Sequence, residues 1–194
     1  MSTPLPPDFY NQPTLTVARK LLGARLVRIQ DGIRLVGLIT ETEAYVGETD
    51  LACHAKAGCT PRTQVMYGPP GRAYVYFTYG MHWMLNAVAE AEGFPAAVLL
   101  RAVEVVDGNE LVRVRRAGVP EKHWTDGPAK LARAFDVAAA QNGIDLTTTA
   151  AGLWIEPGQP VLDESVTIGP RVGLYSVPEP WKSRPWRFLN KRST

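Results

Sequence analysis

Glu41, Glu43 and Tyr45 stand at alternate positions in the segment 40–45. Alternate side chains of a strand share one face, so two carboxylates and one aromatic ring are expected side by side. The later segment 74–82 carries three tyrosines, a glycine and a histidine within nine positions. Acid–base groups beside aromatic stacking surfaces are typical of an enzyme that reads a nucleobase.

The glutamate pair has two interpretations. Crowded carboxylates repel each other, which raises one pKa toward the range of a useful general base. In the alternative, both are solvated on an exposed sheet face. Strict alternation predicts that the opposite face packs on the core with the residues Val36, Leu38, Thr40, Thr42, Ala44 and Val46, and that Ile39 lies on the glutamate face.

Arg101 favours the chemical interpretation, because it interrupts the apolar run 97–103. A guanidinium among apolar neighbours needs a partner, and Glu41 or Glu43 is the obvious carboxylate. A carboxylate and an arginine together can orient a water molecule. A purely structural ion pair is the other possibility, since such pairs also shift pKa values.

The segment 72–88 predicts a β-hairpin with an apolar tip at Tyr79 and Met81. Apolar tips are unfavourable in water unless they enter a partner, and proteins that open a duplex insert such wedges between base steps. The alternative is a tip folded back on the core. Tyr45, Tyr76 and His54 then form a candidate slot with a π surface, although a lone histidine is more often structural.

Composition sets limits on the class of protein. The chain has 194 residues, of which 45% are hydrophobic and 21% charged, as in one ordinary globular domain. No apolar run reaches the ~20 residues that cross a bilayer, and the start lacks signal-peptide character. We expect a monomer without membrane association, in the cytoplasm, associated with the nucleoid in a bacterium or nuclear in a eukaryote.

Cysteine and charge distribution refine these limits. Cys53 and Cys59 lack the further ligands that a zinc site needs, so no metal and no cofactor are expected, and both thiols are predicted to be free. Net charge is only +2, but basic and aromatic side chains alternate from residue 181 to 194, and three arginines cluster at 113–116. Such mixtures suit nucleic-acid contacts, whereas charge clusters alone usually mark solvated surfaces.

The element pattern predicts an α+β fold. An irregular N-terminal segment 1–13 precedes one domain, 14–194, with a curved, mostly antiparallel sheet and flanking helices. Helices are expected at 14–22 and from 128 toward 142, and strands at the ranges 24–29, 35–46, 72–78, 83–88, 96–105, 153–155, 161–168 and 171–174.

These residues resemble the alkyladenine (methylpurine) DNA glycosylase family. The motifs that carry the resemblance are ETEAY at 41–45, His54, TPR at 60–62, YVY at 74–76, YGM at 79–81, LLRA at 99–102, GPAKL at 127–131, GPRVG at 169–173 and PWRF at 185–188. They cover nearly the whole chain from about residue 15. The resemblance implies one α+β domain whose β-hairpin inserts into DNA, and no metal.

The resemblance also implies roles for individual residues. Glu43 activates water against the anomeric carbon of a damaged nucleotide, Arg101 helps to hold that water, and Glu41 supports them. The flipped base is enclosed by Tyr45, His54, Tyr76 and Asn86, and the hairpin residues Tyr79 and Met81 enter the duplex. The implied partner is double-stranded DNA with damaged purines such as 3-methyladenine, 7-methylguanine, hypoxanthine and ethenoadenine, and the product is an abasic site in an intact strand.

Two other functions are consistent with part of the sequence. A noncatalytic module for damaged DNA would keep the wedge and the basic tail, but it would have no use for Glu43. A carbohydrate hydrolase could use Glu41 and Glu43, but glycosidase carboxylates flank the bond that they cleave, whereas these two share one side.

Overall fold

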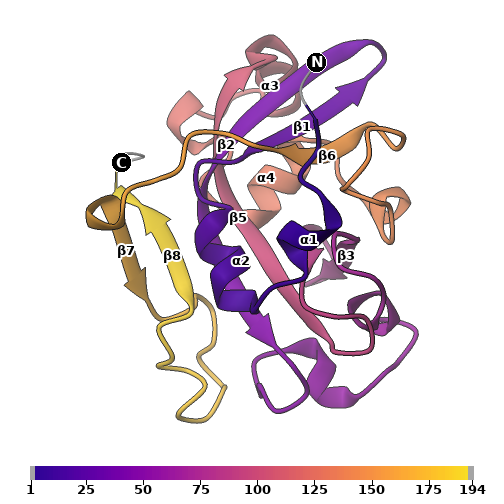
Figure 1. The fold of residues 1–194 in the computed structure, drawn as a ribbon. Helices are drawn as coiled ribbons and strands as arrows, with labels where there is room; N and C mark the ends of the chain where they lie inside the picture. The colour runs from indigo at the N-terminus through magenta and orange to yellow at the C-terminus, as the bar shows by residue number, and fades with distance from the viewer. Residues whose placement is uncertain (1–2, 192–194) are drawn as a thin grey trace.

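Eight antiparallel strands form one sheet in the computed structural model, which describes residues 3–191. The strands are β1 (Arg25–Gln30), β2 (Ile33–Val46), β3 (Ala73–Thr78), β4 (His82–Val88), β5 (Ala96–Asp107), β6 (Leu153–Glu156), β7 (Val166–Gly169) and β8 (Arg187–Asn190). They lie in the order β3-β4-β5-β2-β1-β6. Strand β8 joins β2 to β7, and β7 and β8 lie side by side near the C-terminus (Figure 1). The helices are α1 (Pro7–Tyr10), α2 (Thr14–Lys20), α3 (Asn109–Arg115) and α4 (Pro128–Ala134). This arrangement confirms the α+β prediction.

Strand β2 is the centre of the sheet. It pairs with β5 along nearly its whole length, while its other edge pairs first with β1 and then with β8. The turn from β1 to β2 consists of Asp31 and Gly32, both with positive φ, as a two-residue hairpin of type I′ requires. The predicted hairpins β1–β2 and β3–β4 are therefore both confirmed.

Helices α2 and α4 contribute to one apolar core with the sheet. Val17 of α2, Leu21 directly after this helix and Leu131 of α4 are fully buried in it. Thr42 of β2 is also buried, and its hydroxyl donates a hydrogen bond of 2.8 Å to the Ala18 carbonyl of α2. These contacts fix the middle of β2 against the core and leave its opposite face for the site.

A pair of β-bulges overturns the simple alternation that the sequence suggested. Between Ile39 and Thr42 the pairing of β2 with β5 shifts twice, leaving Thr40 and Arg101 without partners in the register. The extra residue Thr40 moves the residues that follow it in β2 to the other face, and Arg101 has the same effect in β5. Ile39 consequently lies in the main core with Ala44, and not on the glutamate face as predicted.

Several boundaries also differ from the predictions. The segment 1–13 was expected to be irregular, yet Pro7–Tyr10 forms a helical turn, because Tyr10 is fully buried and the Leu5 amide bonds to β6. Helix α4 ends early, since Asp136 adopts a positive φ. Residues 171–174 form turns instead of a strand, and the predicted strand 161–168 begins only at Val166.

Candidate active site

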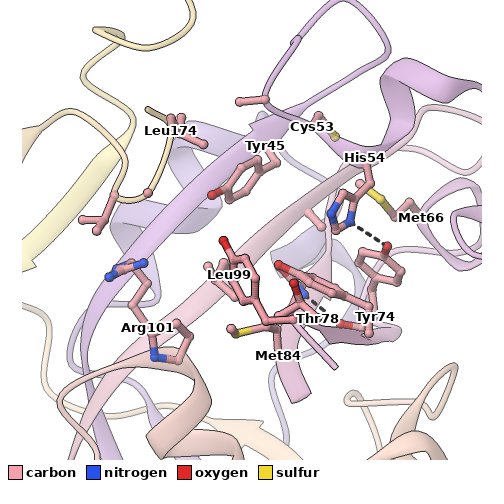
Figure 2. A pocket seen from close by; sticks show the side chains of 18 residues that line it. Tyr45, Cys53, His54, Met66, Tyr74, Thr78, Met84, Leu99, Arg101 and Leu174 are labelled. Carbon is pink, nitrogen blue, oxygen red and sulfur yellow. Dashed lines mark hydrogen bonds between the residues drawn. The ribbon is translucent and has the colours of Figure 1, made fainter. Parts of the chain in front are cut away.

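A cavity of about 310 Å³ opens on the face of β2 and β5 that turns away from the main core. Strands β3 and β4, the 3-10 helix at His54–Ala57 and the loop 172–174 complete its wall. Its lining includes Tyr45, Cys53, His54, Met66, Tyr74, Tyr76, Thr78, Tyr79, Met84, Asn86, Leu99, Arg101 and Leu174. Figure 2 shows Arg101 at one side of the cavity and His54 and Tyr74 at the other.

Glu43 is held by three donors beside this cavity. One carboxylate oxygen, Oε1, accepts a hydrogen bond of 2.6 Å from the Val172 amide and lies 3.4 Å from the Arg101 guanidinium. The other oxygen, Oε2, accepts a hydrogen bond of 2.8 Å from the Tyr45 hydroxyl. The Glu43 side chain has no exposed surface, but all three donors belong to residues that line the cavity. The carboxylate is therefore fixed directly behind the cavity wall.

Burial raises the pKa of Glu43 above its ordinary value. Arg101, the Val172 amide and the Tyr45 hydroxyl favour the charged form and oppose this rise, while Glu41 adds to it. Burial also raises the pKa of Tyr45, so its phenol stays protonated and remains a donor. A carboxylate in such surroundings accepts a proton more readily than a solvated one, as a general base must.

Arg101, for which the sequence predicted Glu41 or Glu43 as the partner, is shared by both glutamates. The Arg101 Nε atom donates a hydrogen bond of 2.9 Å to Glu41, which also lies 3.2 Å from Nε of Arg187. Both glutamates are buried, which contradicts the alternative of a solvated face. Glu41 therefore fixes the orientation of Arg101, and Arg101 is the link between the two carboxylates.

Aromatic rings build the wall opposite Arg101. The rings of His54 and Tyr76 lie edge to face with centroids 4.5 Å apart, and His54 Nδ1 shares a hydrogen bond of 3.0 Å with the Tyr74 hydroxyl. Burial, together with the nearby charges of Arg62 and Lys56, lowers the pKa of His54 to about 4. The imidazole is thus neutral near pH 7, and it presents a hydrogen-bonding group without a charge.

Asn86 is nearly completely buried and is one of the residues that line the cavity. Its side-chain amide donates a hydrogen bond of 2.9 Å to the Tyr74 carbonyl across the β3–β4 pair. This bond fixes the orientation of the Asn86 amide, because the carbonyl that accepts it belongs to the backbone of β3. The structure brings together in one cavity Tyr45, His54 and Tyr76, which the sequence suggested as a slot, Asn86, which the family resemblance added, and Arg101.

The β3–β4 tip stands in solvent beside the cavity. Tyr79 is 80% exposed and Met81 68% exposed, which contradicts the alternative of a tip folded on the core. Tyr79 and Gly80 both have positive φ, and the Met81 amide bonds to the Thr78 carbonyl, so the turn is tight. Positive φ is unfavourable for a bulky residue such as tyrosine, so the backbone at Tyr79 is strained.

The loop after β7 contains site residues that sequence reasoning missed. Residue 172 supplies the amide on Glu43, and neighbouring Arg171 is buried and forms a bidentate pair with Asp50, at 2.5 and 2.9 Å. The motif at 169–173 was visible in the sequence. However, the strand expected at 171–174 gave no reason to place the Val172 amide against Glu43. The feature of the sequence that could have indicated this role was Arg171, an arginine in a short turn bounded by glycine and proline.

Several arginines of the two basic clusters, at 113–116 and from residue 181 onward, make contacts within the protein. Arg187 pairs with Glu41, Arg115 donates to the Ala134 carbonyl, and Arg113 pairs with Glu110. Arg184 lies over the rings of Trp181 and Trp186, and Arg192 falls outside the described residues. Their contact with nucleic acid stays a prediction.

Metal and membrane features were also sought in residues 3–191. Over this range no group of three or more histidine, cysteine or acidic side chains is arranged to hold a metal ion. Both cysteines are free, as predicted. None of the helices in the same range combines the length and apolar character needed to cross a membrane.

Known proteins with similar sequences cover almost the entire chain. The family model described as methylpurine-DNA glycosylase (MPG) matches residues 8–194. A protein from Myxococcus xanthus is 49% identical over 95% of this chain and 88% of its own length, and one from Methanocella arvoryzae is 46% identical over 97% and 93%. Both are provisionally named 3-methyladenine DNA glycosylases. On this evidence the chain belongs to the methylpurine-DNA glycosylase family.

Proposed function

We propose that this protein is a monofunctional DNA glycosylase of base excision repair. It hydrolyses the N-glycosidic bond of alkylated purines, such as 3-methyladenine and 7-methylguanine, after they have been flipped out of duplex DNA. The observation that carries the proposal is the Glu43 carboxylate, fixed by Arg101, Tyr45 and the Val172 amide behind an aromatic cavity. The relatives' names and the family agree with this activity.

The proposed reaction is a hydrolysis with one general base. Glu43 takes a proton from a water molecule as the water oxygen bonds to C1′ of the nucleotide. The bond from C1′ to the purine breaks, and its electron pair leaves with the purine. An N3- or N7-alkylated purine is cationic, so it leaves as a neutral base and requires no acid catalyst. Arg101 orients the water and stabilises the charged form of Glu43.

The cavity suits a cationic ring. Tyr45 and Tyr76 present π surfaces, which attract cations by about 0.5–2 kcal/mol depending on desolvation. The neutral imidazole of His54 adds no repulsion at pH 7. Asn86 is proposed to discriminate against the exocyclic amine of normal guanine, because its amide orientation is fixed by Tyr74.

The exposed tip is proposed to act during base flipping. Tyr79 and Met81 enter the duplex where the nucleotide leaves, which offsets the few kcal/mol lost on unstacking. Damaged pairs are weaker, so flipping itself favours them. The proposed partner is double-stranded DNA, bound by a monomer. No lysine is among the described residues that line the cavity, which agrees with an enzyme that leaves the strand intact.

The test is a single-turnover assay with excess protein. Duplex oligonucleotides carrying 7-methylguanine or 3-methyladenine should release free base and acquire alkali-labile sites, while undamaged duplex should not. Hypoxanthine and ethenoadenine belong in the panel, since these neutral bases need protonation to leave and should react more slowly. Binding without base release would establish the noncatalytic module instead, and strand breaks without alkali would contradict the monofunctional mechanism.

A further inference from the structure

Asp50 and Arg171 form a fully buried ion pair outside the group of residues that the proposed reaction uses. Both side chains have no exposed surface, and the two guanidinium nitrogens Nη1 and Nη2 bond to the two carboxylate oxygens of Asp50. Arg171 also donates to the carbonyls of Ala44, at 2.9 Å, and Trp181, at 3.2 Å. A single side chain therefore joins β2, the loop after it and the irregular segment 171–186.

The same guanidinium lies over two aromatic rings. Its central carbon is 4.7 Å from the ring centroid of Tyr45 and 4.9 Å from that of Trp186. Asp50, for its part, accepts hydrogen bonds from the amides of Val46 and Ala52. Asp50 and Arg171 therefore connect the loop between β2 and His54 to the ring of Tyr45.

Stability alone is a poor explanation for this arrangement. A buried ion pair is often no more stabilising than apolar packing of the same volume, because both charges lose their hydration. Here Nε of Arg171 is buried without a hydrogen-bond partner, which adds a further cost. What the pair provides is geometry, since a bidentate guanidinium accepts only a narrow range of positions.

We propose that Arg171, clamped by Asp50, is a positioning residue for the catalytic carboxylate. It fixes the loop 171–174 so that the Val172 amide stays on Glu43, and it holds the Tyr45 ring on the cavity wall. This inference rests on the proposed glycosylase function, because it assigns Arg171 a role in the same reaction. Arg171 acts through Val172 and Tyr45, and it does not touch the reacting atoms.

The test replaces Arg171 by lysine and, separately, Asp50 by asparagine. Lysine keeps the charge but cannot form the bidentate pair or reach both carbonyls. We expect single-turnover excision to fall by about 10- to 100-fold, as misplacement of a catalytic group by about 1 Å can cause. The acid limb of the pH–rate profile should move to higher pH, because Glu43 loses a donor that favours its charged form.

Amide hydrogen exchange gives a readout that does not depend on activity. The Val172 amide should exchange faster in R171K than in the wild type. The control is Arg34→Lys, which alters an ion pair with buried Glu156 at 2.9 Å without contact to the site; excision and Val172 exchange should stay within about twofold of the wild type, the range of an uninvolved surface contact.

The outcomes separate the two proposals. If R171K and D50N melt at lower temperature but keep the excision rate, the pH midpoint and the Val172 protection, the pair is only structural and the positioning role is overturned. A slower rate with unchanged Val172 exchange also overturns it. An inactive wild type refutes the glycosylase function, and the exchange measurement still decides whether Arg171 positions the loop.

Discussion

Glu43 and Glu156 are two buried carboxylates of one sheet with closely similar partners. Each bonds to an aromatic donor two residues away in its own strand, Tyr45 at 2.8 Å and Trp154 at 3.2 Å, and each faces an arginine. They differ in where the arginine lies. The Arg34 side chain beside Glu156 is 40% exposed, whereas the Arg101 side chain beside Glu43 is 13% exposed and lines a cavity.

We expect this difference to separate a structural ion pair from a catalytic one. Water screens the partly exposed pair of Arg34 and Glu156, so this pair only holds the carboxylate in place. Arg101 lines the cavity and is shared with Glu41, and the Glu43 carboxylate lies directly behind the wall of a space that a substrate can fill. The donor groups are alike, and the two sites differ in the surroundings of the arginine.

The largest expected effect comes from removing the charge of Glu43, and the same substitution at Glu156 serves as the control. Glu43→Gln should reduce excision of 7-methylguanine by at least about 10²-fold, and up to ~10⁴-fold, because general-base catalysis contributes that much. Glu156→Gln should stay within about twofold of the wild type, as expected for a substitution away from the site. The measurement is the single-turnover rate constant, with DNA affinity measured separately to show that E43Q still binds. Normal excision by E43Q would show that another group is the base.

The sequence predicted one of these two carboxylates and missed the other. Arg101 signalled a paired carboxylate at Glu41 or Glu43, because an arginine within an apolar strand needs a partner, and Arg101 in fact pairs with both. Glu156 lies just after the expected strand 153–155, and nothing local marks it as buried. Its burial follows from the pairing of β6 with β1, a contact between segments more than a hundred residues apart.

The features of the fold that the sequence predicted are local, whereas those that it did not predict depend on long-range contacts. The hairpins β1–β2 and β3–β4 were predictable because turn residues and strand alternation lie within one short window. The bulges at Thr40 and Arg101 were not, since they depend on how two distant strands fit together. Strand β8 was hidden in a basic tail, where the buried Phe188 and pairing with β2 outweigh the polar composition.

A smaller effect is expected from the aromatic donors. Tyr45→Phe removes the hydroxyl that favours the charged form of Glu43, so the pKa of Glu43 should rise further. The acid limb of the pH–rate profile should move to higher pH, and excision at pH 7 should fall by roughly tenfold, the equivalent of about one lost hydrogen bond to a charged group. Trp154→Phe removes the matching donor of Glu156 and serves as the control. If both variants shifted the profile equally, the comparison between the two carboxylates would fail.

The smallest effect is on stability, and its sign differs between the two carboxylates. The folded protein raises the pKa of Glu43 above 4.5, so the contribution of Glu43 to stability is fully present below pH 4.5 and is lost as the pH rises through the folded value. Glutamine does not titrate, and E43Q should therefore melt above the wild type at pH 8, with the two converging toward pH 4.5.

Glu156→Gln should melt below the wild type at pH 8, because it weakens the pair with partly exposed Arg34 by about 1 kcal/mol, or 2–4 °C for a chain of this length. Thermal melts of the three proteins between pH 4.5 and 8 measure both effects. A destabilised E43Q at pH 8 would mean that the fold favours the charged Glu43, as it would favour a purely structural carboxylate. Stabilisation of E43Q together with loss of excision would instead identify Glu43 as a group whose charge the fold maintains at a cost in stability.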